Sequence, residues 1–290
     1  MEIVKGSKGK LFIFLLTTAV SLVIYTGTLA SLFRFAWRDE TVSYIPLVPL
    51  VSAWFLFESR KEVFARKVGW FLPGLVPIAV GIALYAIGAS QAVQLTIANR
   101  QIVMTLSFIV CWVGLLGLCY GPGAWKAASF PLLFLLFMLP IPEGLLDPIV
   151  LALQRGSAEV SYAFFRASGI PVYRDGFLFS IPGLTIEVAR ECSGIRSSLS
   201  LLLTMLVAGH LFLKKGWNKF YLCLAVVPVT IFKNGVRIVS LTLLGVYVDR
   251  RILDSELHRN GGILFFAFGL VLLGGVLWLL RRTERQVGGR

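Results

Sequence analysis

Long apolar runs recur along the chain, and short segments rich in lysine and arginine separate them. A helix that spans a membrane needs roughly 20 apolar residues. The pattern therefore predicts eight spans, at residues 11–33, 44–57, 70–87, 102–118, 127–140, 198–213, 220–248 and 261–280. The second and fifth runs are short. The seventh would reach about 43 Å as a helix, against about 30 Å for the hydrocarbon core, so it must tilt, break or project.

The longest polar interval, residues 141–197, lies between the fifth and sixth predicted spans. Its first half has apolar residues at helical spacing and predicts one or two amphipathic helices on the membrane surface. Its second half alternates apolar and polar residues, with turns at Asp175-Gly176 and Pro182-Gly183, and predicts a β-hairpin or three short strands. The predicted fold class is an all-α polytopic membrane protein, one membrane domain over residues 1–290 with this small insertion.

Composition and charge agree with a membrane protein. The chain is 57% hydrophobic and 15% charged, with a mean hydropathy of +0.81, whereas soluble domains are about half apolar and a quarter charged. With the N-terminus inside, the predicted cytoplasmic segments carry 15 basic and 4 acidic residues, and the external ones 11 of each. The excess of inside lysine and arginine predicts that both termini are cytoplasmic in a cell (inner) membrane.

The net charge of +13 is thus explained by topology and by contact with anionic membrane lipid. No basic patch with interleaved aromatic residues points to a nucleic-acid partner. The first apolar run is about 23 residues long, which exceeds the 7–15 residues of a signal-peptide core, so a retained first span is expected.

One of the four cysteines has polar neighbours. The spacing of the four includes no CxxC pair and no metal-ligand pattern, and three of them lie in apolar runs: Cys111, Cys119 and Cys223. The fourth, Cys192, stands in "ECSGIRSS" directly before the sixth predicted span, where Ser193 is a plausible N-cap. The helix start, together with Arg190 and Arg196, favours the thiolate, and Glu191 opposes it. The alternative is an inert cysteine at a helix start.

An arginine inside the seventh span is the second unusual feature. Arg237 lies in "KNGVRIVSLTLLG" with apolar residues on both sides, where insertion costs about 2.5–3.5 kcal/mol. Such a residue faces a polar cavity or a partner, or else it snorkels to the interface. Asn234 is three residues earlier and shares its helical face, whereas Lys233 faces elsewhere and is interpreted as structural.

The third feature is a histidine just outside the eighth span. His258 is expected on the same side of the membrane as Cys192, while His210 would lie about 27 Å from Cys192 along the sixth helix. Taken alone, His258 is better explained as a solvated loop residue. Together, a cysteine and a histidine can serve as an acyl-transfer nucleophile and its acid or base, and an arginine can stabilise an oxyanion.

In these three places the sequence resembles the exosortase/archaeosortase family of membrane cysteine transpeptidases. The resemblance covers most of the chain and is strongest over residues 140–280. "ECSGIRSS" corresponds to the nucleophile motif with Cys192, Ser193, Gly194 and Arg196, "NGVR" to N-x-x-R with Asn234 and Arg237, and "HRNGG" to H-x-x-x-G with His258 and Gly262. An "SHG" that is frequent in the family near the start of the second span appears here only as "VSYIP", so the subfamily is left open.

The resemblance implies Cys192 as nucleophile, Arg237 as the oxyanion-stabilising or substrate-positioning cation and His258 as acid/base, with no cofactor and no metal. It also implies exported protein substrates with a C-terminal sorting signal, consisting of a Pro-Glu-Pro-like motif, a membrane span and a basic tail. The site would be extracytoplasmic and would transfer the protein to an unidentified surface acceptor. The alternatives are a hydrolytic intramembrane protease with water as acceptor, and a non-enzymatic transporter or scaffold for exopolysaccharide export.

Overall fold

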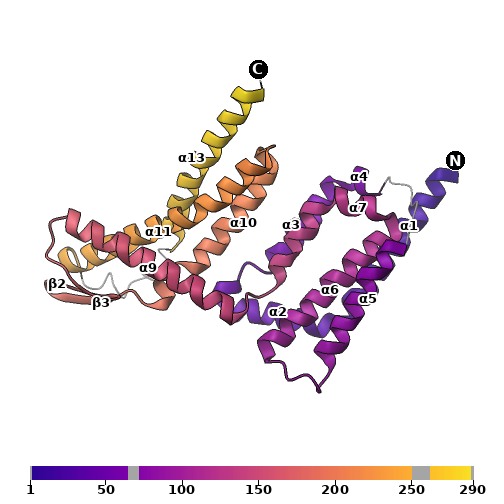
Figure 1. The fold of residues 1–290 in the computed structure, drawn as a ribbon, viewed down its shortest axis with the longest axis horizontal. Helices are drawn as coiled ribbons and strands as arrows, with labels where there is room; N and C mark the ends of the chain where they lie inside the picture. Colours follow the sequence, from indigo (N-terminus) through magenta and orange to yellow (C-terminus); the bar gives the residue numbers. More distant parts are fainter. Residues whose placement is uncertain (1, 65–71, 250–261, 289–290) are drawn as a thin grey trace. The chain divides into compact units, whose positions relative to one another are not determined.

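A computed structural model describes residues 2–64, 72–249 and 262–288, and it divides into two compact units, Met1–Pro142 and Glu143–Arg290 (Figure 1). Each unit is described by itself. The single domain expected over residues 1–290 remains a prediction.

The first unit is helical throughout its described part. Its elements are α1 (Glu2–Ile24), α2 (Thr26–Arg38), η1 (Glu40–Val42), α3 (Leu47–Glu58), α4 (Arg60–Phe64), α5 (Leu72–Ala89), α6 (Ile97–Tyr120), α7 (Pro122–Ala127), α8 (Ser129–Phe134) and η2 (Leu135–Met138). Helices α5 and α6 run side by side, with Gly74, Gly81 and Gly88 of α5 at the contact. A Cβ on Gly74 would lie 2.3 Å from the backbone nitrogen of Leu118, so the two backbones approach closely there.

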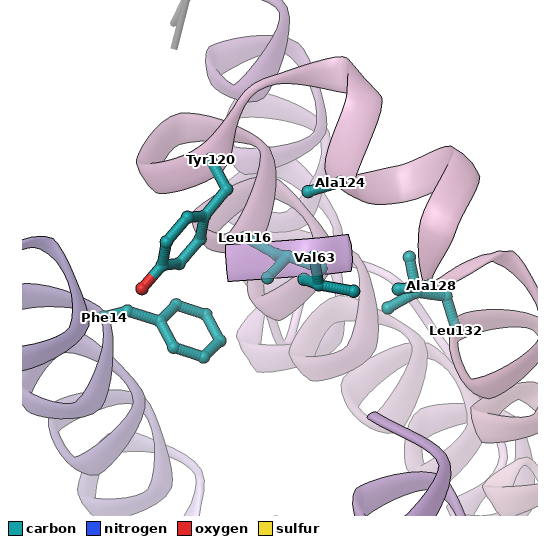
Figure 2. Packing of buried hydrophobic residues seen from close by; sticks show 7 residues of the cluster. All are labelled: Phe14, Val63, Leu116, Tyr120, Ala124, Ala128 and Leu132. Atoms are coloured by element: carbon teal, nitrogen blue, oxygen red, sulfur yellow. The ribbon is translucent and has the colours of Figure 1, made fainter. Parts of the chain in front are cut away.

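An apolar cluster joins one end of α6 to its neighbours. Figure 2 shows its seven members, which are Phe14 of α1, Val63 of α4, Leu116 and Tyr120 of α6, Ala124 of α7, and Ala128 and Leu132 around α8. The Phe14 and Tyr120 rings meet edge to face at 5.8 Å, a favourable arrangement for two aromatic rings.

The second unit carries every candidate site residue that the structure describes. It contains α9 (Glu143–Ala167), β1 (Tyr173–Asp175), β2 (Leu178–Ile181), β3 (Leu184–Glu187), η3 (Arg190–Ser193), α10 (Ile195–Phe212), α11 (Gly216–Tyr247) and α13 (Gly262–Gly288). The strands form an antiparallel sheet in the order β1-β2-β3. Turns join them at Gly176, with a φ of 58°, and at Pro182-Gly183, where Gly183 has a φ of 82°. The predicted Pro182-Gly183 turn is confirmed, and the first turn begins at Gly176, one residue later than expected.

One face of the sheet packs on α9 and α11. Phe179 in the central strand is fully buried and joins Phe165 of α9 and Val239 of α11 in one apolar cluster. The opposite face is exposed, since exposed and buried residues alternate along β2. The sheet thereby fixes the segment that leads from β3 into η3.

Helices α9 and α11 approach closely through small residues. A Cβ on Gly235 of α11 would lie 2.5 Å from Cγ1 of Val160, and one on Gly156 would lie 2.8 Å from Cδ1 of Ile231. The buried hydroxyls of Ser157 and Ser161 face the same contact region. Small residues let helix backbones approach in this way in membrane proteins.

Five helices are long and apolar enough to cross a membrane: Leu72–Ala89, Ile97–Tyr120, Ile195–Phe212, Gly216–Tyr247 and Gly262–Gln286. They coincide with the predicted third, fourth, sixth, seventh and eighth spans. The seventh does not break at Gly235, because α11 is one helix of 32 residues and about 48 Å long. It must therefore tilt or project from the hydrocarbon core.

The other three predicted spans differ from simple helices. The first is a pair of helices, Gly9–Ile24 and Thr26–Arg38, with a bend of 68° between them. At the start of the second helix the Thr26 hydroxyl donates to the carbonyl of Leu22. Hydrogen bonds of this kind often bend helices. The second is the 12-residue α3, and the fifth is α8 with η2, which counts as a span only together with α9. The described helices thus allow five to seven spans, and the count of eight remains a prediction.

The close contact at Gly235 predicts a specific sensitivity. Gly235→Ala should destabilise the protein by about 1–3 kcal/mol, because the new methyl overlaps the stiff, β-branched Val160. Heating the detergent-solubilised protein and following its monodisperse fraction would measure the loss. Gly275→Ala is the matched control, since nothing lies within 4 Å of a Cβ there. Equal melting temperatures for the two variants would contradict this packing.

Candidate functional site

Cys192 lies in η3, the single 3₁₀ turn between the sheet and α10. Gly194 ends this turn with a φ of 80°, and α10 begins at the next residue. A left-handed φ costs a residue with a Cβ about 1–2 kcal/mol, so glycine suits this position. The backbone of Cys192 is therefore held immediately before a helix start, as the sequence indicates.

The N-cap prediction was wrong by one residue. Gly194 is the N-cap of α10, and Ser193 is the last residue of η3. The Ser193 side chain is fully buried, and its hydroxyl accepts from the Ile195 amide at 3.4 Å. Gly194, with its positive φ, separates η3 from α10, so α10 starts only at Ile195. The spacing of polar residues alone does not reveal this.

Asn234 joins η3 to α9 and α11. Its side chain is 1% exposed and donates through Nδ2 to the Ser157 hydroxyl of α9 at 3.0 Å. A Cβ on Gly194 would lie only 3.3 Å from Cγ of Asn234, so the turn after Cys192 rests directly on this amide. Two of the three sequence motifs, those of Cys192 and Arg237, are thereby brought together.

A buried lysine supports the same turn. Lys233 is 3% exposed, and its ammonium group donates to the Ser197 hydroxyl in the first turn of α10. Ser197 in turn donates to the carbonyl of Gly194 at 2.9 Å. The sequence interpretation of Lys233 as structural agrees with these contacts, although its link to the Cys192 turn was not foreseen.

Arg237 follows Asn234 by three residues on the unbroken helix α11 and is half-buried. Arg196, the alternative cation, is the second residue of α10 and has an exposed side chain. Arg237 is thus more enclosed by the protein than Arg196. His258 lies outside the described residues, and Gly262 is the first residue of α13.

Sequence reasoning missed the partners that α9 supplies. Ser157 and Ser161 are fully buried and four residues apart, which puts two small polar side chains on one face of α9. That spacing was the available signal for a close, hydrogen-bonded helix contact. Asp147, which pairs with Arg190 of η3, gave no signal in the sequence.

The two ion pairs near the sheet differ in their surroundings. Arg174 binds Glu159 at 2.8 Å and lies over the rings of Tyr162 and Phe179. Its hydrogen bond holds the pKa of the Glu159 carboxyl below the usual value. The pair of Arg190 with Asp147 is open, because both side chains are more than half exposed.

Comparison with known families gives one match. The chain matches the family described as Transmembrane exosortase (Exosortase_EpsH) over residues 36–275. Searches of curated proteins and of solved structures gave no match. The matched range includes the Cys192, Asn234 and Arg237 positions.

The contact between Gly194 and Asn234 can be tested without a substrate. Gly194→Ala adds a strained φ and a methyl group against Asn234, whereas Gly169→Ala adds strain at a φ of 72° with nothing within 4 Å. Gly194→Ala should therefore destabilise the protein more, and it should change the alkylation rate of Cys192 in a variant whose other cysteines are serines. The measurements are thermal melting and iodoacetamide labelling.

A double-mutant cycle of Gly194→Ala with Asn234→Ala provides the control. Contact predicts a coupling free energy of about 0.5–3 kcal/mol. Additive effects would show that the turn does not rest on this side chain.

Proposed function

Since this chain belongs to the transmembrane exosortase family, we propose that it is a membrane cysteine transpeptidase that processes exported proteins. Its substrates would carry a C-terminal sorting signal with a Pro-Glu-Pro-like motif, a membrane span and a basic tail. The enzyme would cleave beside the motif and transfer the new carboxyl end to a surface acceptor.

The observation that carries this proposal is the close approach of Gly194 to Asn234, so close that a Cβ on Gly194 would lie 3.3 Å from Cγ of Asn234. It places the cysteine segment against the part of α11 that holds the N-x-x-R motif. The two motifs, 42 residues apart in the sequence, thus meet at one buried junction, which supports a shared role.

The reaction follows from the residue types. The Cys192 thiolate attacks the scissile carbonyl, and the guanidinium of Arg237 stabilises the oxyanion that develops. His258 protonates the leaving amine, and a thioester to Cys192 remains. The acceptor nucleophile then attacks the thioester while His258 takes its proton, which restores the thiolate.

The membrane supplies the orientation of the substrate. A substrate held by its own span would diffuse in the bilayer and enter between helices, with its motif at the external face. Confinement of this kind converts binding into alignment at the reacting atoms. We place Cys192 and His258 on the extracytoplasmic side, with both termini cytoplasmic, because this arrangement gives the inside excess of lysine and arginine.

Two alternatives differ in measurable ways. A hydrolytic protease would use the same residues and release a free carboxylate, so mass analysis of the product separates it from a transpeptidase. A transporter or scaffold would tolerate the loss of Cys192.

The thiol of Cys192 should be essential and accessible from outside. Cys192→Ala and Cys192→Ser should abolish processing with unchanged protein abundance, since neither residue supplies a thiolate. A membrane-impermeant maleimide added to spheroplasts should also block processing by the wild-type protein. Immunoblots of the substrate would follow both effects.

Cys223→Ser is the control, because Cys223 belongs to α11, near its predicted inner end. Normal processing by Cys192→Ala would reject the nucleophile assignment. Inhibition only after lysis would reverse the proposed sidedness.

The cation should be Arg237 and not Arg196. Arg237→Ala should lower kcat/KM by at least about 10²–10³, the usual effect of removing an oxyanion donor. Arg237→Lys should recover only part of the rate, since lysine lacks the planar fork. Peptide cleavage by the purified protein would measure both values.

Arg196→Ala is the matched control and should retain most of the activity. If Arg196→Ala were inactive and Arg237→Ala active, the assignment would be reversed.

A further inference from the structure

A hollow of about 340 Å³ lies beside the segment that carries Cys192. Five of its lining residues come from α9 and one from η3: Asp147, Pro148, Val150, Leu151, Gln154 and Arg190. Its volume is at the lower end of the range for ligand sites, which is about 300–1,000 Å³. It is therefore large enough for one or two peptide side chains.

The hollow is close to Cys192 along the chain. Arg190 and Cys192 belong to the same 3₁₀ turn, in which two residues advance by about 4 Å. An extended peptide advances about 3.3 Å per residue. The step from Cys192 to Arg190 along the turn thus equals about one or two residues of an extended peptide whose scissile carbonyl lies at Cys192.

The part of α9 that lines the hollow is held in place by a hydrogen bond and by burial. The Gln154 amide donates to the carbonyl of Val188 at 2.6 Å and is 9% exposed, and Val150 is 4% exposed. These contacts tie α9 to the chain between β3 and η3. The hollow is thus a feature of packed elements.

The charged pair that lines the hollow is exposed to solvent. The Arg190 and Asp147 side chains are 57% and 53% exposed, and exposed pairs of this kind contribute little to stability. By contrast, the Arg174 side chain is 19% exposed and is enclosed by two rings and Glu159. An incoming carboxylate can therefore replace Asp147 at Arg190 without loss of packing.

We propose that this hollow binds the substrate peptide beside the scissile bond, and that Arg190 selects an acidic side chain by exchanging Asp147 for the carboxylate of the peptide. The inference rests on the proposed function, which supplies the peptide. Arginine suits this role because its planar fork holds a carboxylate through two hydrogen bonds. Asp147 acts as a competitor that neutralises Arg190 when no substrate is bound.

Binding to the full-length Cys192→Ala protein in detergent tests the inference apart from catalysis. The probe is a fluorescein-labelled peptide with a glutamate within two residues of the scissile bond, followed by an apolar span and a basic tail, and its twin has glutamine at that position. Fluorescence anisotropy gives Kd for both peptides.

Arg190→Gln should weaken binding of the glutamate peptide about tenfold or more, the usual effect of losing a hydrogen bond to a charged group, and should leave the glutamine peptide unchanged. Asp147→Asn should tighten binding of the glutamate peptide, because it removes the competitor. Arg190→Glu should prefer a peptide with lysine at the same position. Arg174→Gln is the matched control and should preserve the preference for glutamate.

If the pair of Arg190 and Asp147 only stabilised the structure, the variants would affect peptide binding differently. In that case Arg190→Gln and Asp147→Asn would weaken binding equally and for both peptides, and the inference would be overturned. Equal binding of the two peptides by the Cys192→Ala protein would also overturn it. Cleavage of both peptides by the wild-type protein would at the same time leave the proposed function intact, whereas cleavage of neither would reject that function separately.

Discussion

The buried amide of Asn234 is the junction on which the arrangement of the candidate site depends. The amide donates a hydrogen bond to Ser157 of α9 and lies against Gly194. Asn234 itself belongs to α11. A side-chain amide that is 1% exposed cannot lose such a partner without a desolvation penalty of about 1–3 kcal/mol. The position of the turn after Cys192 is therefore coupled to the packing of two long helices.

The rest of the second unit can be understood from that constraint. Gly156 and Gly235 let α9 and α11 approach closely enough for the Asn234 hydrogen bond. Lys233 is linked to the same turn, because its ammonium group donates to the Ser197 hydroxyl and Ser197 donates to the carbonyl of Gly194. Polar groups in an apolar bundle need internal partners, and here those partners hold the segment that carries Cys192.

The sequence predicted those elements that depend on local pattern. Five predicted spans coincide with long apolar helices, because hydropathy over 20 residues reflects the solvent around the helix. The turn at Pro182-Gly183 was predictable because proline has a fixed φ that suits a turn and glycine readily takes the positive φ that follows it. The short α3 follows from the short second run, whereas the bend between α1 and α2 was not predicted, since an apolar run does not reveal where a helix bends.

Some residues of the candidate site could likewise be predicted from the sequence, and others could not. Cys192, Asn234 and Arg237 stand out because their residue types are unusual beside apolar spans, and motif order linked them. Ser157, Ser197 and Asp147 are ordinary residues in the sequence, and their contacts arise only when helices distant in sequence pack together. The Gly194 N-cap of α10 was missed because a positive φ is a property of the folded turn.

The central claim is that Cys192 carries the substrate as a thioester between cleavage and transfer. Intact-mass analysis of the purified protein, mixed with a signal-bearing peptide in the absence of an acceptor, tests it most directly. We expect a mass increase equal to the N-terminal peptide fragment less one water, located at Cys192 and released by neutral hydroxylamine. Continued cleavage of the peptide with no adduct, or with an adduct on another residue, would contradict it.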